Sequence, residues 1–242
     1  MGLYNIQDSI IEFPERQEAP EPMHRFVRLA LVVAVLATAT IVGAAASSAV
    51  LARNDKPTAS AFKAEMRKLW EDHITWTRLY IVSAATLDTD LPDIGVTADR
   101  LFRNQADIGA AVGSFYGVKA GDALTALLNE HISLAAEAIA KAKADDQAGL
   151  ADALDRWYAN ADEIARFLAT ANPRSWPFEM MQAHMRDHLD LTLEEAVARL
   201  NSDYAADVAA YDKVHGQILE MADMLSDGII AAFPDRFTGS GR

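Results

Sequence analysis

Two stretches of the sequence carry side chains whose types could do acid–base or metal chemistry. Residues 129–137 read NEHISLAAE and residues 186–194 read RDHLDLTLE, so that an acidic residue precedes His131 and His188 in turn. In both stretches a glutamate follows the histidine six positions later. Neighbouring residues of a helix point about 100° apart, so an acid next to a histidine cannot easily share its target. We therefore expect a buried polar network here in preference to catalysis.

The residues before each stretch repeat as well. Arg100 and Asn104 correspond to Arg156 and Asn160 at a spacing of 56 positions. Two helical hairpins then carry the same order of polar residues and would pack about a pseudo-two-fold axis. The alternative is chance similarity between alanine-rich amphipathic helices. The predicted network comprises Arg100, Asn104, Asp107, His131, Glu137, Arg156, Asn160, Glu163, His188 and Glu194.

A metal site is a second interpretation of the same region. His184 and His188 lie four residues apart, the spacing at which two imidazoles on one helix face can bind one ion. Met181 and Met185 lie close to that face, and thioethers beside imidazoles suit copper(I), with His131 as a further ligand. The alternative is that the methionines fill a gap in the core.

Other enzyme signatures are missing from the sequence. There is no glycine-rich phosphate loop, no HExxH and no Glu-x-x-His pair of the kind that diiron bundles use. Around Trp70, His73, Trp76 and Arg78, aromatic residues beside an arginine could line a pocket for an anionic or aromatic small molecule. The same residues could equally form a packed interior. We expect a protein that is not an enzyme.

Composition narrows the class of protein. The chain has 242 residues, with 35 acidic against 22 basic side chains and a formal net charge of −13. That charge repels nucleic acid over most of the surface, so nucleic-acid binding is not expected. No cysteine is present, which excludes disulfides and thiolate ligands.

Hydrophobic periodicity predicts an all-α fold. Apolar residues recur at helical spacing in six segments, and turn residues separate them. Short connections between six helices favour an antiparallel bundle. We expect helices from about residue 58 to 86, 97 to 117, 120 to 144 and 145 to 171, a fifth that begins at about 177, and a last from 202 or 203 to about 233.

The N-terminal part contains a candidate membrane span. Residues 29–52 carry no charge and, as a helix, would be about 36 Å long, enough to cross a hydrocarbon core of about 30 Å. A buried core helix or a cleaved secretory signal are the alternatives. We expect a single-pass anchor in the bacterial inner membrane with the main domain periplasmic or extracytoplasmic. The expected organisation is a disordered acidic tail at 1–25, an anchor at 26–53, a helical-bundle domain at 58–236 and a mobile tail at 237–242.

The sequence also shows a family resemblance. Residues 69–78 read LWEDHITWTR, residues 100–104 read RLFRN, and residues 157–164 read WYANADEI. In these motifs the chain resembles a family of uncharacterised bacterial helical proteins, over about residues 66–234. The resemblance implies a helical domain and, because the family has no established activity, implies no cofactor or substrate.

Three functions are consistent with these observations. The first is a non-enzymatic, membrane-anchored bundle that binds a membrane-protein partner as an accessory subunit, with residues 29–52 in the lipid bilayer. The second is a metal-binding periplasmic bundle that uses a transition metal. The third is a small-molecule sensor domain.

Overall fold

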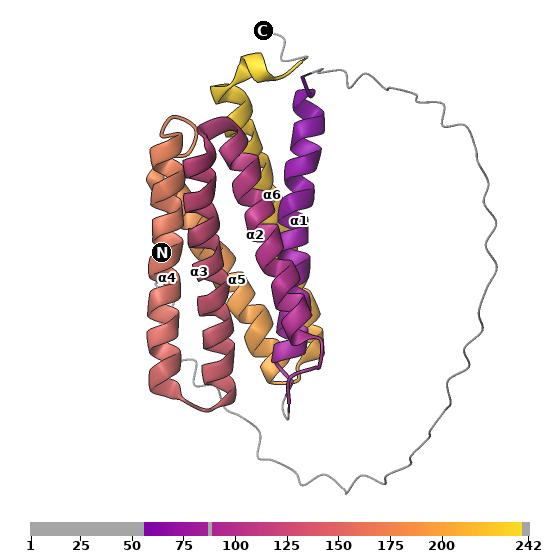
Figure 1. The fold of residues 1–242 in the computed structure, drawn as a ribbon. Coiled ribbons are helices and arrows are strands. Elements are labelled where there is room, and N and C mark those ends of the chain that lie inside the picture. The colour runs from indigo at the N-terminus through magenta and orange to yellow at the C-terminus, as the bar shows by residue number, and fades with distance from the viewer. Residues whose placement is uncertain (1–55, 87–88, 239–242) are drawn as a thin grey trace, which may run out of the picture. The chain divides into compact units, whose positions relative to one another are not determined.

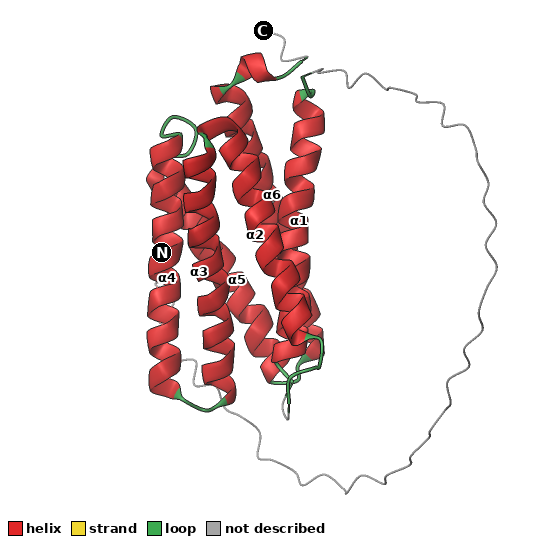
Figure 2. Ribbon diagram, viewed as in Figure 1, coloured by secondary structure: helices red, strands yellow, loops and turns green. Residues whose placement is uncertain are grey.

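The structure, a computed structural model, describes residues 56–86 and 89–238. These residues form an all-α bundle, as the sequence predicts (Figures 1 and 2). The only extended pairing among them is an isolated bridge between Thr58 and Thr238. The helices are α1 (Ala59–Ala84), α2 (Ile94–Tyr116), α3 (Val118–Lys143), α4 (Gln147–Ala171), α5 (Phe178–Leu200), α6 (Tyr204–Ala232) and the short 3₁₀ helix η2 (Pro234–Arg236).

Local sequence signals fix several helix starts. The side chains of Thr58, Asp146 and Asp203 accept hydrogen bonds from backbone N–H groups in the first turns of α1, α4 and α6, at 3.0, 2.9 and 3.0 Å. Such N-caps satisfy donors that have no partner within the helix. Gly117 separates α2 from α3 with φ 94°, a conformation that glycine adopts without strain. This single glycine is therefore enough to connect α2 to α3.

The six helices form a closed circle in which each packs chiefly against its two neighbours in sequence, and α6 packs against α1. The connections alternate between the two ends of the bundle, so α1, α3 and α5 run in one direction and α2, α4 and α6 in the other (Figure 1). Side chains on the inner faces of α1, α3 and α5 can therefore meet at the same level along the bundle axis.

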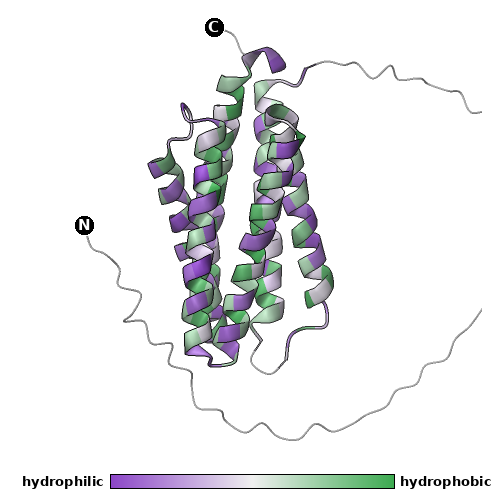
Figure 3. Cartoon of the chain, turned by 60° about the vertical axis from the view of Figure 1, so that its left-hand side comes forward, coloured by the Kyte–Doolittle hydropathy of each residue, from purple (hydrophilic) through white to green (hydrophobic). Residues whose placement is uncertain are grey.

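The apolar core fills the inside of this circle. Each helix carries both hydrophobic and hydrophilic residues (Figure 3), and the hydrophobic ones supply the interior. The largest fully buried side chains are Trp176, Met66, Ile74, Ile81, Leu101, Ile108, Leu124, Ile164, Met181, Leu189, Ile218 and Met221.

Both described ends of the chain meet at one end of the bundle. The backbone N–H of Thr238 donates to the carbonyl of Pro57 at 3.0 Å. The buried Phe237 packs its ring against Phe62, with ring centres 5.1 Å apart, and against Phe115. The packing thus continues past the predicted domain limit at residue 236.

The predicted anchor at 26–53 and the acidic tail at 1–25 lie outside the described residues. Within the described part of the chain, no helix combines the length and the apolar character that crossing a membrane requires.

Candidate functional site: a buried histidine centre

Three histidines meet inside the bundle, one from each helix of the same direction. His73 of α1, His131 of α3 and His188 of α5 are each only 2–3% exposed. The ring centres of His73 and His188 are 5.7 Å apart, and those of His131 and His188 are 6.2 Å apart. We call these three residues the histidine centre.

An amide from the following helix holds each of these imidazoles. Gln105 Nε2 donates to Nδ1 of His73 at 3.2 Å. In the other two pairs the direction is reversed. Nδ1–H of His131 donates to Asn160 Oδ1 at 3.1 Å, and Nδ1–H of His188 donates to Gln217 Oε1 at 3.3 Å.

The amide orientations follow from their other hydrogen bonds. Asn160 Nδ2 donates to the carbonyl of Leu127 at 3.2 Å, and Gln217 Nε2 donates to the carbonyl of His184 at 3.0 Å. Their oxygens therefore face the histidines and accept the Nδ1 protons. As a result, the neutral forms of His131 and His188 carry a lone pair on Nε2.

The three hairpins α1–α2, α3–α4 and α5–α6 share this arrangement. In each, an amide on the second helix donates to the carbonyl four residues before the histidine. In the first hairpin Asn104, next to Gln105, makes this bond to Leu69 at 2.9 Å. Asn160 and Gln217 make the equivalent bonds in the other two hairpins.

Burial keeps the imidazoles neutral. Loss of solvent lowers the pKa of His131 to about 3, helped by His188, and lowers the pKa of His188 to about 4. The pKa of His73 is lowered well below its ordinary value, first by burial and then by the other two histidines. No carboxylate contributes to these shifts, so a proton on any one imidazole has no counter-charge beside it.

Three polar atoms in this region lack a hydrogen-bond partner among the described residues. They are Gln105 Oε1 and the indole Nε1 atoms of Trp70 and Trp157, all buried. The indole rings pack beside the centre, with ring centres 5.9 Å from His73 and 5.4 Å from His131, respectively. Buried polar atoms usually find partners, so each of these three atoms is left with an unmet hydrogen bond among the described residues.

A second buried cluster joins charged residues of α1, α5 and α6. Arg78 Nη1 lies 2.7 Å from Glu195 Oε1 and 2.6 Å from Asp207 Oδ1, and Arg199 lies 3.4 Å from Asp207. Both carboxylates are fully buried. Burial raises the pKa of Glu195 to about 7 although Arg78 opposes the shift. Arg78 thus links α1 to α5 and α6, while Glu195 Oε2 has no hydrogen-bond partner among the described residues.

The structure separates the predicted polar network into inner and outer parts. His131, His188 and Asn160 belong to the histidine centre, and Asn104 lies beside Gln105. The arginines turn outward instead. Arg100 pairs with Asp72 at 3.0 Å and Arg156 with Glu137 at 2.6 Å, while Glu194 pairs with Lys213. Asp107 and Glu163 are exposed.

The predicted copper ligands on α5 also divide. Met181 and Met185 are buried in the apolar core, His188 lies in the histidine centre, and His184 is only half-buried. As the side chains stand, no group of three or more histidine, aspartate or glutamate residues in the described ranges is arranged to hold a metal ion.

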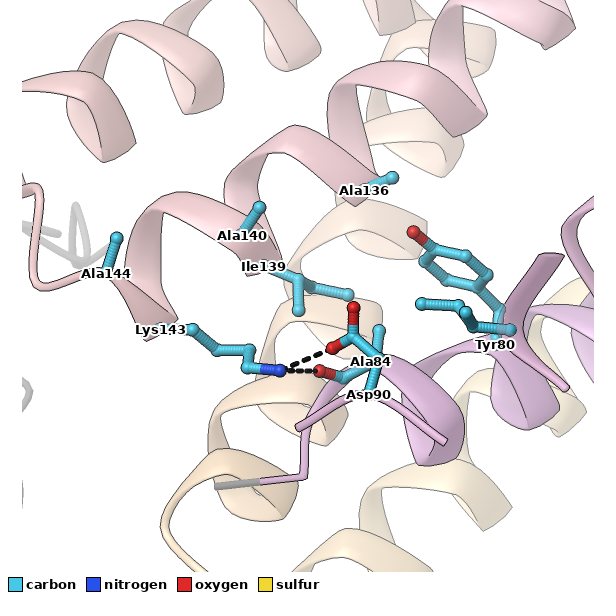
Figure 4. A pocket seen from close by; sticks show the side chains of 9 residues that line it. Tyr80, Ala84, Asp90, Ala136, Ile139, Ala140, Lys143 and Ala144 are labelled. Carbon is cyan, nitrogen blue, oxygen red and sulfur yellow. Dashed lines mark hydrogen bonds and ion pairs between the residues drawn. The ribbon is translucent and has the colours of Figure 1, made fainter. Parts of the chain in front are cut away.

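Residues of the predicted first-helix pocket face different partners. Trp70 and His73 point into the core, Arg78 joins the buried ion pairs, and Trp76 lies under the guanidinium of Arg100. A shallow hollow lies nearby, between the end of α1, the following loop and α3 (Figure 4). There Lys143 donates to the carbonyl of Ala84 at 2.7 Å and to Asp90 at 2.5 Å.

Sequence reasoning missed His73, Gln105 and Gln217 as members of the centre. One signal was available, because His73 precedes His131 by 58 positions, nearly the 57 that separate His131 from His188. The ion-pair partners of Arg78 had no comparable signal.

Comparison of the chain with protein-family models, curated proteins and solved structures finds no match.

Proposed function

We propose that the chain is a non-enzymatic, membrane-anchored bundle that serves as an accessory, partner-binding subunit of a bacterial membrane complex. The observation that supports this proposal is that buried polar side chains of the described residues bond to one another inside the bundle. The three histidines, whose pKa values are lowered, each bond to an amide of the next helix, and the buried acids Glu195 and Asp207 pair with Arg78 of α1. Contacts of this kind fix the register of a bundle and make it a rigid platform.

The uncharged run at 29–52 supplies the anchor in this proposal, and residue 57 begins the bundle directly after it. The main domain lies on the periplasmic side of the inner membrane. Pro57 and Thr238 are hydrogen-bonded, so the start of α1 and the segment after α6 lie at the same end of the bundle.

We also propose that the bundle arose from a repeated helical hairpin. Three histidine–amide pairs at equivalent positions support three copies, one more than the two that the sequence indicates. The hairpins begin at α1, α3 and α5. The three copies are therefore related by rotation about the long axis of the bundle, and not by a two-fold axis.

Membrane fractionation tests the anchor. The full chain is expected to stay in the membrane pellet after alkaline carbonate washing. Replacing Ile41 by arginine puts a charge at the centre of the span, costs about 3 kcal/mol of insertion energy and is expected to release the chain. Val118→Arg is the matched control, since Val118 is 74% exposed on the bundle. Release of the unaltered chain would contradict the anchor.

Orientation and partnership have separate tests. Because the chain has no cysteine, Val118→Cys creates a single exposed thiol. A membrane-impermeant maleimide is expected to label it in intact spheroplasts, and labelling only after lysis would place the bundle in the cytoplasm. Purification in mild detergent is expected to yield a second protein in fixed ratio, which the Ile41→Arg chain loses. A chain that purifies alone would refute the accessory role.

A further inference from the structure

We propose that an apolar face at one end of the bundle docks a basic, amphipathic helix of the partner subunit. This inference rests on the proposed accessory role and adds the place of contact and the chemistry of the partner. The face lies where α1 ends and α2 and α6 begin, opposite the end at which Thr58 and Thr238 meet (Figure 1). We call it the distal face, and it comprises Leu79, Leu91, Val96, Tyr204 and Val208.

The distal face holds most of the exposed large hydrophobic side chains of the described residues. Its five members are between 38 and 69% exposed. Among the described residues one further side chain belongs to this class, Val118, which lies at the opposite end of the bundle. Single exposed hydrophobic residues are ordinary on a protein surface, whereas a contiguous group of them marks an interaction site.

Contacts between α1 and α6 place two members of the face side by side. Arg78 Nη1 of α1 lies 2.6 Å from Asp207 Oδ1 of α6. Leu79 and Val208 are the next residues along each helix and are both exposed, so they lie at the same level along the bundle axis. Tyr204 lies one turn before Val208 on the same side of α6.

Contacts between α1 and α2 bring in the other two members. The guanidinium of Arg100 in α2 lies over the ring of Trp76 in α1, 5.1 Å from its centre. Val96 lies one turn before Arg100 and therefore level with the last turns of the antiparallel α1. The backbone N–H of Leu91 donates to the carbonyl of Ser83 at 2.9 Å, which folds the loop back on the end of α1. The face is thus continuous across α6, α1 and α2.

Acidic side chains surround the distal face. The exposed aspartates on these elements are Asp90, Asp93, Asp99, Asp203 and Asp212. The exposed basic residues nearby are Arg103 and Lys213, and Lys213 is paired with Glu194 at 2.6 Å. Lys143 offsets only Asp90. The excess of negative charge attracts a partner segment that carries lysine and arginine beside its apolar residues.

The form of the face suits a helix as its occupant. An amphipathic helix binds by laying its apolar side into a groove between neighbouring helices. A shallow hollow lined by Val96, Asp99 and Arg103 adjoins the face and can receive a side chain of that helix. The same aspartates repel anionic lipid headgroups and the equally acidic face of a second copy of this chain. The charge therefore favours a basic protein segment over both.

Substitutions in the full chain test the face. Val208→Glu and Leu79→Glu put a charge into the contact and are each expected to lower the ratio of co-purified partner to chain at least about tenfold. Val118→Glu, at the opposite end, is the matched control and is expected to keep the ratio. Asp99→Lys is expected to lower the ratio as well, with the exposed Asp122→Lys at the start of α3 as its control. Circular dichroism checks that each variant is folded.

Photo-crosslinking in intact cells identifies the occupant. A benzophenone amino acid replaces Val208, and mass spectrometry gives the sequence of the crosslinked peptide. We expect a segment of one other protein with apolar residues at helical spacing and more lysine and arginine than aspartate and glutamate. Leu79→Glu is expected to suppress this product and Val118→Glu to leave it. A crosslink to lipid, to a second copy of the chain or to an acidic segment, or no product, would overturn the proposal.

Failure of the face and failure of the accessory role give different results. If the Val208→Glu and unaltered chains hold a second protein in the same ratio, the distal face is overturned and the accessory role stands. If the unaltered chain purifies alone, the accessory role is refuted, and the crosslink at Val208 in intact cells still decides the distal face.

Discussion

Acid should destabilise the bundle long before its surface carboxylates are protonated. At neutral pH the histidine centre is uncharged, because the pKa values of His131 and His188 are about 3 and 4. An unfolded histidine has a pKa of about 6.5, so below that pH the unfolded chain binds protons that the folded chain refuses. The stability that the centre contributes is complete above pH 6.5 and is lost as the pH falls toward 4.

The size of the effect follows from the pKa differences. Between pH 7.5 and 5, His131 and His188 each cost about 2 kcal/mol of unfolding free energy, or about 4 kcal/mol together, and His73 adds to the loss in the same direction. Glu195 acts in the opposite sense, because its folded pKa of about 7 exceeds its ordinary value of 4.5. Folding then takes up a proton, which returns about 2 kcal/mol over the same range. The expected net loss from His131, His188 and Glu195 is about 2 kcal/mol, and His73 increases it.

Urea unfolding, followed by circular dichroism at several pH values between 7.5 and 5, measures this loss. The lower limit of pH 5 keeps Asp162 and Asp223 ionised in the folded state, because Arg186 and Arg67 lower their pKa values. His188→Gln removes one titrating group and is expected to reduce the loss by about 2 kcal/mol, whereas Glu195→Gln is expected to increase it by about 2 kcal/mol. Stability that does not change between pH 7.5 and 5, or a His188→Gln chain with the slope of the unaltered one, would refute the reasoning.

Three further predictions concern packing and capping. Gly121→Ala is expected to destabilise the α2–α3 contact by more than about 1 kcal/mol, because the added Cβ would lie 2.5 Å from the Gly109 carbonyl oxygen. Gly216 has open space around it, so Gly216→Ala is expected to stabilise α6 by about 0.5–1 kcal/mol, and equal urea midpoints for the two variants would contradict this. Ile74→Ala is expected to cost 2–5 kcal/mol through a core cavity, against less than about 0.5 kcal/mol for the exposed Leu79→Ala, and calorimetry compares the two. Asp203→Ala removes the cap of α6 and is expected to cost about 1 kcal/mol, measured by urea unfolding; no change would show that water replaces the cap.

The sequence by itself determined the class of fold. Helical periodicity reflects which face of a segment is buried, and that is a local property of the chain. The caps at Thr58, Asp146 and Asp203 and the turn at Gly117 are likewise local, so the six helices could be read within a few residues of their limits. The start of α2 at Ile94, near the expected residue 97, shows the usual uncertainty of helix ends.

Only the tertiary structure decided which polar residues meet. The sequence grouped Arg100 and Arg156 with the histidines, but their long side chains turn away from the histidine centre and pair with Asp72 and Glu137. Shorter amides could enter the interior, and the partners of His73, His131 and His188 lie 29 to 32 positions away on the next helix. Helix spacing cannot specify contacts of that range, because they depend on the rotation and height at which two helices pack.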